Sequence, residues 1–254
     1  MQFSRIILLL LLACISHHNC FSQTELTASE VVTKANEKLK GKFTCFSVMN
    51  MQIIRPTWQR SIILKSWSKT MEYSLTLVTA PKKEEGQTFL KRGIEMWNWN
   101  PTIKRMIKLP PTMLSQEWMG SDFTINDLLN QVSLVKDFSH IMLETDIIQG
   151  NECYTMELKP KENVAVVWGK VKMWISKRDF VQLKTEFYDE DNQLVKTERV
   201  CELKKIGGRL IPTGIELVPA NKPGNKTVVK IEWIEFNRPI SDEFFSQQNM
   251  KNVK

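Results

Sequence analysis

The sequence predicts a mainly β protein (α+β), built as one strongly curved antiparallel sheet that forms an incomplete barrel. Most of the chain consists of strand-length runs in which apolar and polar residues alternate. Short turns join successive runs, as in an antiparallel meander. A sheet of about ten or more strands rarely stays flat and curls as its twist accumulates. An N-terminal helix and a mid-chain helical insert are expected to cover the concave face.

The start of the chain has the features of a secretory signal peptide. Arg5 precedes an apolar run over residues 6–15, which is shorter than the about 20 residues that span a bilayer. A basic N-terminal region, a short apolar segment and small residues near the cleavage site are typical of such signals. We therefore predict residues 1–22 as a signal peptide cleaved after Ser22, and residues 23–254 as a single exported β domain.

A second interpretation of the same segment stays open. The stretch Leu11-Leu12-Ala13-Cys14 is a loose lipobox, and its use would leave the protein anchored through a lipid on Cys14. Cleavage at that point leaves only about seven apolar residues before the cut, which is at the short end for a signal.

The first element after the signal is expected to be a helix. Thr27 or Ser29 can cap it, and Glu30 stands three residues after Thr27, the spacing of a capping box. An apolar stripe follows at helical spacing, and Gly41 marks the end. The stripe consists of Val31, Val32, Ala35 and Leu39.

Strands follow the helix in two series. The turns between them carry Pro, Gly, Asn or Asp, which favour chain reversal. The expected strands are 43–55, 58–68, 70–80, 87–92, 93–99 and 103–108 in the first series, and 140–148, 152–159, 165–176, 180–188, 194–206, 209–218 and 227–237 in the second.

An insert over residues 110–131 separates the two series. Pro110 and Pro111 stop the strands, and helical turns are expected at 112–118 and 126–130. Gly120 allows a chain reversal, Asp122 or Thr124 can cap the second turn, and Asp127 suits the positive end of that turn. A further short helix is expected at 241–245.

Alternation along the strands predicts a large apolar face. The plain interpretation is a core filled by the two helical segments. Those segments look short for the area that they must cover, however, and surplus apolar surface indicates a ligand groove or a partner site. Our cavity candidates are the apolar side chains of that face and of the insert: Ile62, Leu64, Tyr73, Leu75, Leu77, Trp97, Met113, Trp118, Met119, Phe123, Leu128, Val171, Met173, Ile175, Leu183 and Phe187.

Chemistry-bearing residues are few. Beyond residue 22, His140 is the single histidine, and three cysteines, Cys45, Cys153 and Cys201, allow at most one disulfide. We therefore expect no metal site, no cofactor and no catalytic residue, so the protein is not expected to be an enzyme. A hydrolase that uses Ser121, Asp122 or Asp127 with His140 is the least favoured alternative.

The net charge is modest and dispersed. Without residues 1–22, which contain one charged residue, 34 basic residues stand against 28 acidic ones, a balance of +6. This excess suits a transient contact with an anionic membrane surface or with an acidic partner. No nucleic-acid motif accompanies the charge, so we expect no nucleic-acid partner.

Two stretches resemble a known family. "MWNWNPTIKRMIKLPP" (96–111), followed by "WMGSDFTINDL" (118–128), resembles the outer-membrane lipoprotein-sorting proteins related to the periplasmic lipoprotein carrier LolA. The resemblance covers roughly residues 27–246, and 120–128 is its most specific part. It implies an incomplete barrel whose open side is closed by helices, with an apolar cavity for acyl chains and no cofactor.

The resemblance also implies a function. We expect a monomeric periplasmic carrier that moves or sorts lipid or lipoprotein acyl chains toward the outer membrane, with an inner-membrane exporter and an outer-membrane acceptor as partners. The cavity candidates would then line the acyl-chain site. The alternative is a non-catalytic structural or protein-interaction module of the cell envelope, which needs a surface and no cavity.

Overall fold

The computed structural model describes residues 25–254 except 41–43, 71, 114, 126, 128–132, 163 and 165. The predicted signal peptide, Gly41, Leu128 and most of the second predicted insert turn therefore lie outside the described residues. Among the residues that are described, no helix is long and apolar enough to cross a membrane.

Helix α1 (Ala28–Lys40) begins with a capping box. The backbone N–H of Thr27 donates to Glu30 Oε2 at 2.8 Å, and the N–H of Glu30 donates to Thr27 Oγ1 at 3.3 Å. Thr27, one of the two predicted candidates, is therefore the cap. Val31, Val32 and Ala35 are buried, which confirms these three residues of the predicted stripe.

The described part of the chain forms one antiparallel sheet of fourteen strands. The strands are β1 (Thr44–Ile54), β2 (Gln59–Lys69), β3 (Tyr73–Ala80), β4 (Thr88–Arg92), β5 (Glu95–Asn100), β6 (Arg105–Lys108), β7 (Phe138–Met142), β8 (Asp146–Ile148), β9 (Asn151–Pro160), β10 (Lys170–Ser176), β11 (Gln182–Tyr188), β12 (Leu194–Ile206), β13 (Arg209–Pro219) and β14 (Lys226–Phe236).

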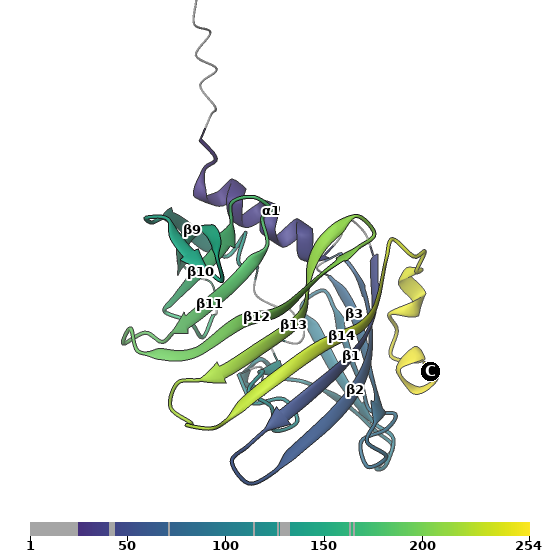
Figure 1. The fold of residues 1–254 in the computed structure, drawn as a ribbon. Helices are drawn as coiled ribbons and strands as arrows, with labels where there is room; N and C mark the ends of the chain where they lie inside the picture. The colour runs from purple at the N-terminus through teal and green to yellow at the C-terminus, as the bar shows by residue number, and fades with distance from the viewer. Residues whose placement is uncertain are drawn as a thin grey trace, which may run out of the picture.

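The strand order is β6-β5-β4-β3-β2-β1-β14-β13-β12-β11-β10-β9-β7, with β8 also paired to β9. Two meanders, β1–β6 and β7–β14, therefore join where the first strand meets the last. The sheet curls into an open barrel, as predicted (Figure 1). Strands β6 and β7 form its two edges and are consecutive in the chain, so the insert between them connects one edge of the open barrel to the other.

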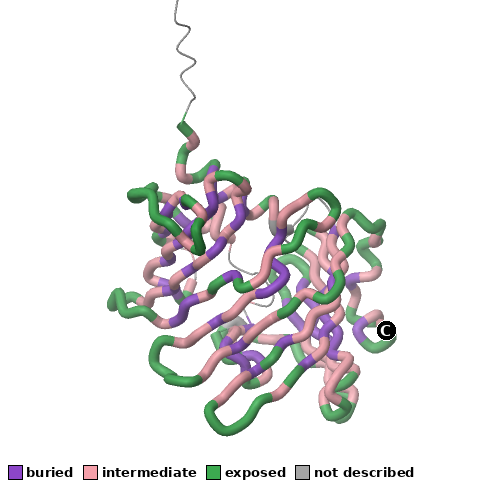
Figure 2. Tube along the Cα trace, viewed as in Figure 1, coloured by how far each residue is buried: buried purple, intermediate pink, exposed green. Residues whose placement is uncertain are grey.

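Burial alternates from residue to residue along β11, and buried clusters pack on both faces of the sheet. Figure 2 shows the burial of each residue along the chain. We call the face toward α1 and the insert the inner face. A row of paired residues crosses it, with each member opposite the next on the neighbouring strand. This apolar row consists of Ile62, Met51, Val229, Ile215 and Val200, one from each of β2, β1, β14, β13 and β12.

The outer face of β2–β5 is covered by the C-terminal segment, residues 239–254. This segment contains two 3₁₀ helices, Asp242–Phe244 and Asn249–Lys251, the first of which confirms the short helix predicted there. Phe245 and Met250 are fully buried against an outer cluster of Trp67, Leu75, Leu77, Leu90 and Trp97. In Figure 1 the segment runs beside β3, on the outside of the barrel.

Three predicted elements differ from the structure. The predicted strand 140–148 is two strands, β7 and β8, separated by residues 143–145, and the predicted strand 165–176 begins only at Lys170. The predicted helical turn 112–118 is reduced to the 3₁₀ helix Pro111–Met113.

Residues 117–124 instead form a tight hairpin. Glu117 pairs with Thr124, and the N–H of Trp118 donates to the carbonyl of Phe123 at 2.8 Å. The backbone φ angles of Met119 and Gly120 are +52° and +75°, and a right-handed helix cannot contain two such residues. The chain reversal predicted at Gly120 is confirmed.

Candidate ligand-binding site

Helix α1 covers one half of the inner face, over β7, β9, β10 and β11. The buried side chains of this helix-covered half include three from α1 and two aromatic rings, Trp168 and Phe187, whose centroids are 5.1 Å apart. Its members are Val31, Val32, Ala35, Phe138, Met156, Leu158, Trp168, Val171, Met173, Ile175 and Phe187.

The insert covers the other half, over β1–β5. Trp118 is 2 % exposed and packs edge-on against Phe89, with 5.3 Å between the ring centroids. Ile125 is buried beside it, and Met119 and Phe123 are partly buried. The sheet contributes Met51, Ile53, Ile62, Leu64, Val78, Phe89 and Met96 to this insert-covered half.

Two arginines tie the insert hairpin to the sheet. Arg55 Nη1 donates to Asp122 Oδ2 at 2.9 Å, and Arg55 Nη2 donates to the carbonyl of Gly120 at 2.7 Å. Asp122 Oδ2 also accepts from Thr227 Oγ1 on β14 at 2.6 Å. Arg60 donates to the carbonyl of Met119. Asp122 is therefore a buried anchor, and the predicted cap is Thr124, whose Oγ1 accepts from the N–H of Asp127 at 3.1 Å.

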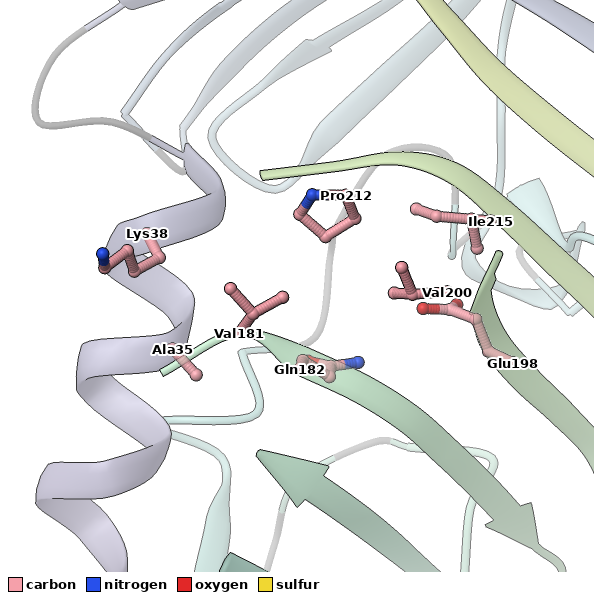
Figure 3. A pocket seen from close by; sticks show the side chains of 8 residues that line it. All are labelled: Ala35, Lys38, Val181, Gln182, Glu198, Val200, Pro212 and Ile215. Atoms are coloured by element: carbon pink, nitrogen blue, oxygen red, sulfur yellow. The ribbon is translucent and has the colours of Figure 1, made fainter. Parts of the chain in front are cut away.

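A small cavity lies between the two halves, where α1 passes β11, β12 and β13. Its volume is about 20 Å³, which is room for about one water molecule. Figure 3 shows the side chains that line it, with Lys38 extending its amine away from the others. The lining residues are Ala35, Lys38, Val181, Gln182, Glu198, Val200, Pro212 and Ile215.

Strand β12 places charged side chains on this otherwise apolar face. Lys196 is 4 % exposed and forms an ion pair with Asp127 of the insert, with 2.5 Å between Nζ and Oδ2. Burial raises the pKa of Glu198 to about 7, although Lys196 favours its ionised form. A second buried lysine, Lys91 on β4, has its pKa lowered to about 8 by burial, against the opposing effect of Glu72.

The structure divides the predicted cavity residues between the two faces. On the inner face it brings together two sets. The first, beneath α1, consists of Val171, Met173, Ile175 and Phe187. The second consists of Ile62 and Leu64 of the sheet with Trp118, Met119 and Phe123 of the insert. Tyr73, Leu75, Leu77 and Trp97 lie instead on the outer face, against the C-terminal segment.

The remaining candidates lie apart from these groups. Leu183 is beside a register shift of β11 and packs with Cys153, Trp174 and Val200. Met113 lies half-buried in its 3₁₀ helix. Leu128 falls outside the described residues.

Sequence reasoning missed Lys196, Glu198 and Lys91 as site residues. The alternation of β12 carried a usable signal, because Lys196 and Glu198 are in phase with the apolar Val200. Strand β4 gave no such signal, because four of its five residues are buried and alternation fails there.

The residues of the least favoured hydrolase have structural partners. Ser121 Oγ accepts from the N–H of Phe123 at 3.2 Å, which closes the hairpin turn. Nε2 of His140 is 2.7 Å from the carbonyl of Leu134. In the described part of the chain no group of three metal-ligating residues occurs, and Cys45, Cys153 and Cys201 are all free thiols.

Solved structures share this architecture. A DUF1329 family protein from Desulfovibrio piger has a TM-score of 0.80 at 20 % identity, with 88 % of this chain and 97 % of that chain covered. A LolA superfamily protein from Nitrosomonas europaea has a TM-score of 0.76 at 25 % identity, with 88 % and 99 % covered. An outer membrane lipoprotein-sorting protein domain from Vibrio parahaemolyticus has a TM-score of 0.78 at 20 % identity, with 88 % and 98 % covered.

These likenesses define the class: the protein is a LolA-like open barrel, and the resemblance expected from the sequence is confirmed. A comparison with curated proteins finds no match. The chain belongs to the family whose model, described as "Uncharacterized protein", matches residues 70–252.

Proposed function

We propose that the protein is a periplasmic carrier for lipid or lipoprotein acyl chains, which it holds between the inner face of the sheet and its cover. One observation carries the proposal. The apolar row crosses five strands, and the inner face around it is covered by α1 and the insert, two segments that belong to different parts of the chain.

Acyl burial provides free energy that offsets the displacement of such a cover. Burial of an acyl chain stabilises by about 0.8 kcal/mol per CH₂, so about ten methylenes provide roughly 8 kcal/mol. The apolar row spans four inter-strand spacings, about 19 Å. Because the cavity between the two halves is only about 20 Å³, an acyl chain can follow this row only after the cover moves off the sheet. The ties of Arg55 and Arg60 to the insert are among the contacts that this movement breaks.

Contact quenching by a brominated fatty acid tests the proposal. Trp118 and Trp168 lie on the inner face, whereas Trp97 lies on the outer face beneath the C-terminal segment. We expect brominated dodecanoate to quench the fluorescence of the purified protein. The quenched amplitude should fall in Trp118→Phe or Trp168→Phe and stay unchanged in the matched control Trp97→Phe.

Mass spectrometry of gently purified protein provides an independent measurement, with co-purifying lipid as the expected result. The absence of both lipid and quenching would contradict the carrier function. If quenching disappears in Trp97→Phe, the ligand binds on the outer face and not on the inner face.

The proposal includes the setting in which such a carrier works. It receives its cargo from an inner-membrane exporter, meets membrane surfaces transiently and delivers to an outer-membrane acceptor, and it acts as a monomer without catalysis. The proposal is supported by the likeness to the LolA superfamily protein and to the lipoprotein-sorting domain.

The cover over the inner face favours a second function. Side chains of α1 and of the insert pack against much of that face in the described residues. A structural or interaction module of the cell envelope needs only an outer surface, so it is compatible with a permanently closed barrel. Retention of this cover in the presence of dodecanoate, without quenching of any Trp, would favour the module.

A further inference from the structure

The surroundings of Lys196 are unusual for an acyl-chain site. Its ammonium nitrogen is 4.8 Å from the ring centroid of Trp168 and 4.9 Å from that of Phe187. A buried ammonium group is strongly destabilising unless an anion pairs with it. Here the anion is Asp127, which the insert supplies.

The residues that pair with Lys196 on the neighbouring strands do not provide a counter-ion. The residues opposite it on the neighbouring strands are Phe187 on β11 and Pro219 on β13. Beyond Phe187 the paired row continues through Val171 and Leu158, which are both fully buried beneath α1. Lys196 is therefore the charged end of a second apolar row.

Movement of the insert separates this ion pair. Cargo entry under the proposed function displaces the cover, and Asp127 leaves together with the hairpin to which its N–H and side chain are bonded through Thr124. The ammonium of Lys196 then remains on an apolar surface and requires another anion.

We propose that Lys196 binds the anionic head group of the cargo, whose carboxylate or phosphate oxygen replaces Asp127 while its acyl chain follows Phe187, Val171 and Leu158. This inference rests on the proposed function and specifies its substrate class as anionic amphiphiles. The exchange substitutes one ion pair of Lys196 for another, so its ammonium group is not left unpaired.

Glu198, two residues along β12, is the carboxyl group that competes with the head group for Lys196. Burial raises its pKa to about 7, Lys196 favours its ionised form, and Asp127 opposes that form. The charged groups that face it are Lys196 and Asp127, and Lys38 of α1 lines the same cavity. The other lining side chains are neutral.

Calorimetric titration of the purified protein with three amphiphiles of equal chain length tests the inference. The probes are dodecanoate, dodecyl phosphate and methyl dodecanoate, which is neutral. A hydrogen bond to a charged group stabilises more than one between neutral groups, so we expect the two anions to bind at least about tenfold more tightly than the ester. Acetate and inorganic phosphate, which lack the chain, should not bind measurably.

Variants assign the preference to one side chain. Lys196→Met should reduce the affinity for both anions to that for the ester, whereas Lys196→Arg should retain the preference. Asp127→Asn removes the competing carboxylate and should tighten anion binding several-fold. Circular dichroism spectra that match those of the wild type will establish that each variant is folded.

The outcomes separate the two proposals. Equal affinity of the wild type for all three amphiphiles leaves the carrier function standing and overturns the role of Lys196, as does a preference that survives in Lys196→Met. Binding of inorganic phosphate as tight as that of dodecyl phosphate overturns it as well, because the site would then be one for a free anion. Failure of every amphiphile to bind the wild type overturns both proposals.

Discussion

At the scale of single residues, the polar side chains of the insert act as anchors. Asp122 follows a serine in the sequence and suggests chemistry there, but its carboxylate is held by Arg55 and Thr227, which lie far from it in the chain. Sequence alone could not identify these partners, because the pairs are 67 and 105 residues apart. The local cap, Thr124 with Asp127, was predictable because it depends on near neighbours.

Removal of the Asp122 carboxylate should destabilise the protein. Asp122→Ala leaves the guanidinium of Arg55 without its counter-ion, and loss of one partner of a buried pair costs about 3–5 kcal/mol. Urea unfolding measures this change. Glu117→Ala, in the same hairpin, is the matched control, because the ion pair of Glu117 with Lys222 of the β13–β14 turn is about half exposed. This substitution should change stability by less than about 1 kcal/mol. Equal losses in both variants would contradict the anchoring role.

Glu198 should make stability depend on pH. Its pKa is raised from 4.5 to about 7 in the folded protein, so the neutral form favours folding. That contribution is fully present below pH 4.5 and is lost as the pH rises toward 7. Relative to the wild type, Glu198→Gln should change little at pH 4.5 and should stabilise by on the order of 2 kcal/mol at pH 8.

Glu186 provides a control in which the pKa shift, and therefore the effect of pH on stability, has the opposite sign to that of Glu198. Burial alone would raise the pKa of its carboxyl group, but hydrogen bonds from Lys184 and Tyr188 outweigh burial and lower it. Its contribution is therefore present at neutral pH and is lost on acidification. Glu186→Gln should destabilise at pH 8, and a shared sign for the two variants at that pH would refute the assignment. Chemical unfolding at both pH values measures the differences.

At the scale of elements, strands were predictable where one face is buried and the other is not. Strand β12 (Leu194–Ile206) agrees with its predicted bounds because alternation and turn residues identify it together. The hairpin at 117–124 was not predictable as such, because its apolar residues suit a helix until two positive φ angles are taken into account. Its packing depends on strands that precede it by tens of residues.

The C-terminal segment accounts for the position of three predicted cavity residues, Tyr73, Leu75 and Leu77, on the outer face of the sheet. Alternation correctly places Tyr73, Leu75 and Leu77 on one face of β3, but it cannot indicate what covers that face. The structure shows Phe245 and Met250 there, with Thr88 Oγ1 donating to the carbonyl of Met250 at 3.0 Å.

Truncation of this segment should expose the outer cluster. Phe245→Ala should cost about 3–5 kcal/mol of stability, and deletion of residues 239–254 should increase binding of a hydrophobic dye and promote aggregation. Gln248→Ala, at an exposed position of the same segment, should change stability by less than about 0.5 kcal/mol. Unchanged dye binding after the deletion would show that the segment does not cover the cluster.

At the scale of the whole molecule, the curved sheet and its covered inner face were predictable, because strand number and twist together require curvature. The division of the cover into α1 over one half and the insert over the other was predictable only in outline. The charged residues of the inner face were not predicted, because burial of a lysine depends on a counter-ion from another element, as Asp127 shows for Lys196.

The pairing of β1 with β14 has a consequence for how the protein acquires its structure. Each meander can form from strands that are near neighbours in sequence, but Met51 of β1 pairs with Val229 of β14 where the two meanders join. This junction can form only after β14 has been synthesised, and loop closure over such a separation slows folding. Until then β1 presents an unpaired apolar edge, which is prone to wrong pairing. A chain of this design needs protection from aggregation until its final strand arrives.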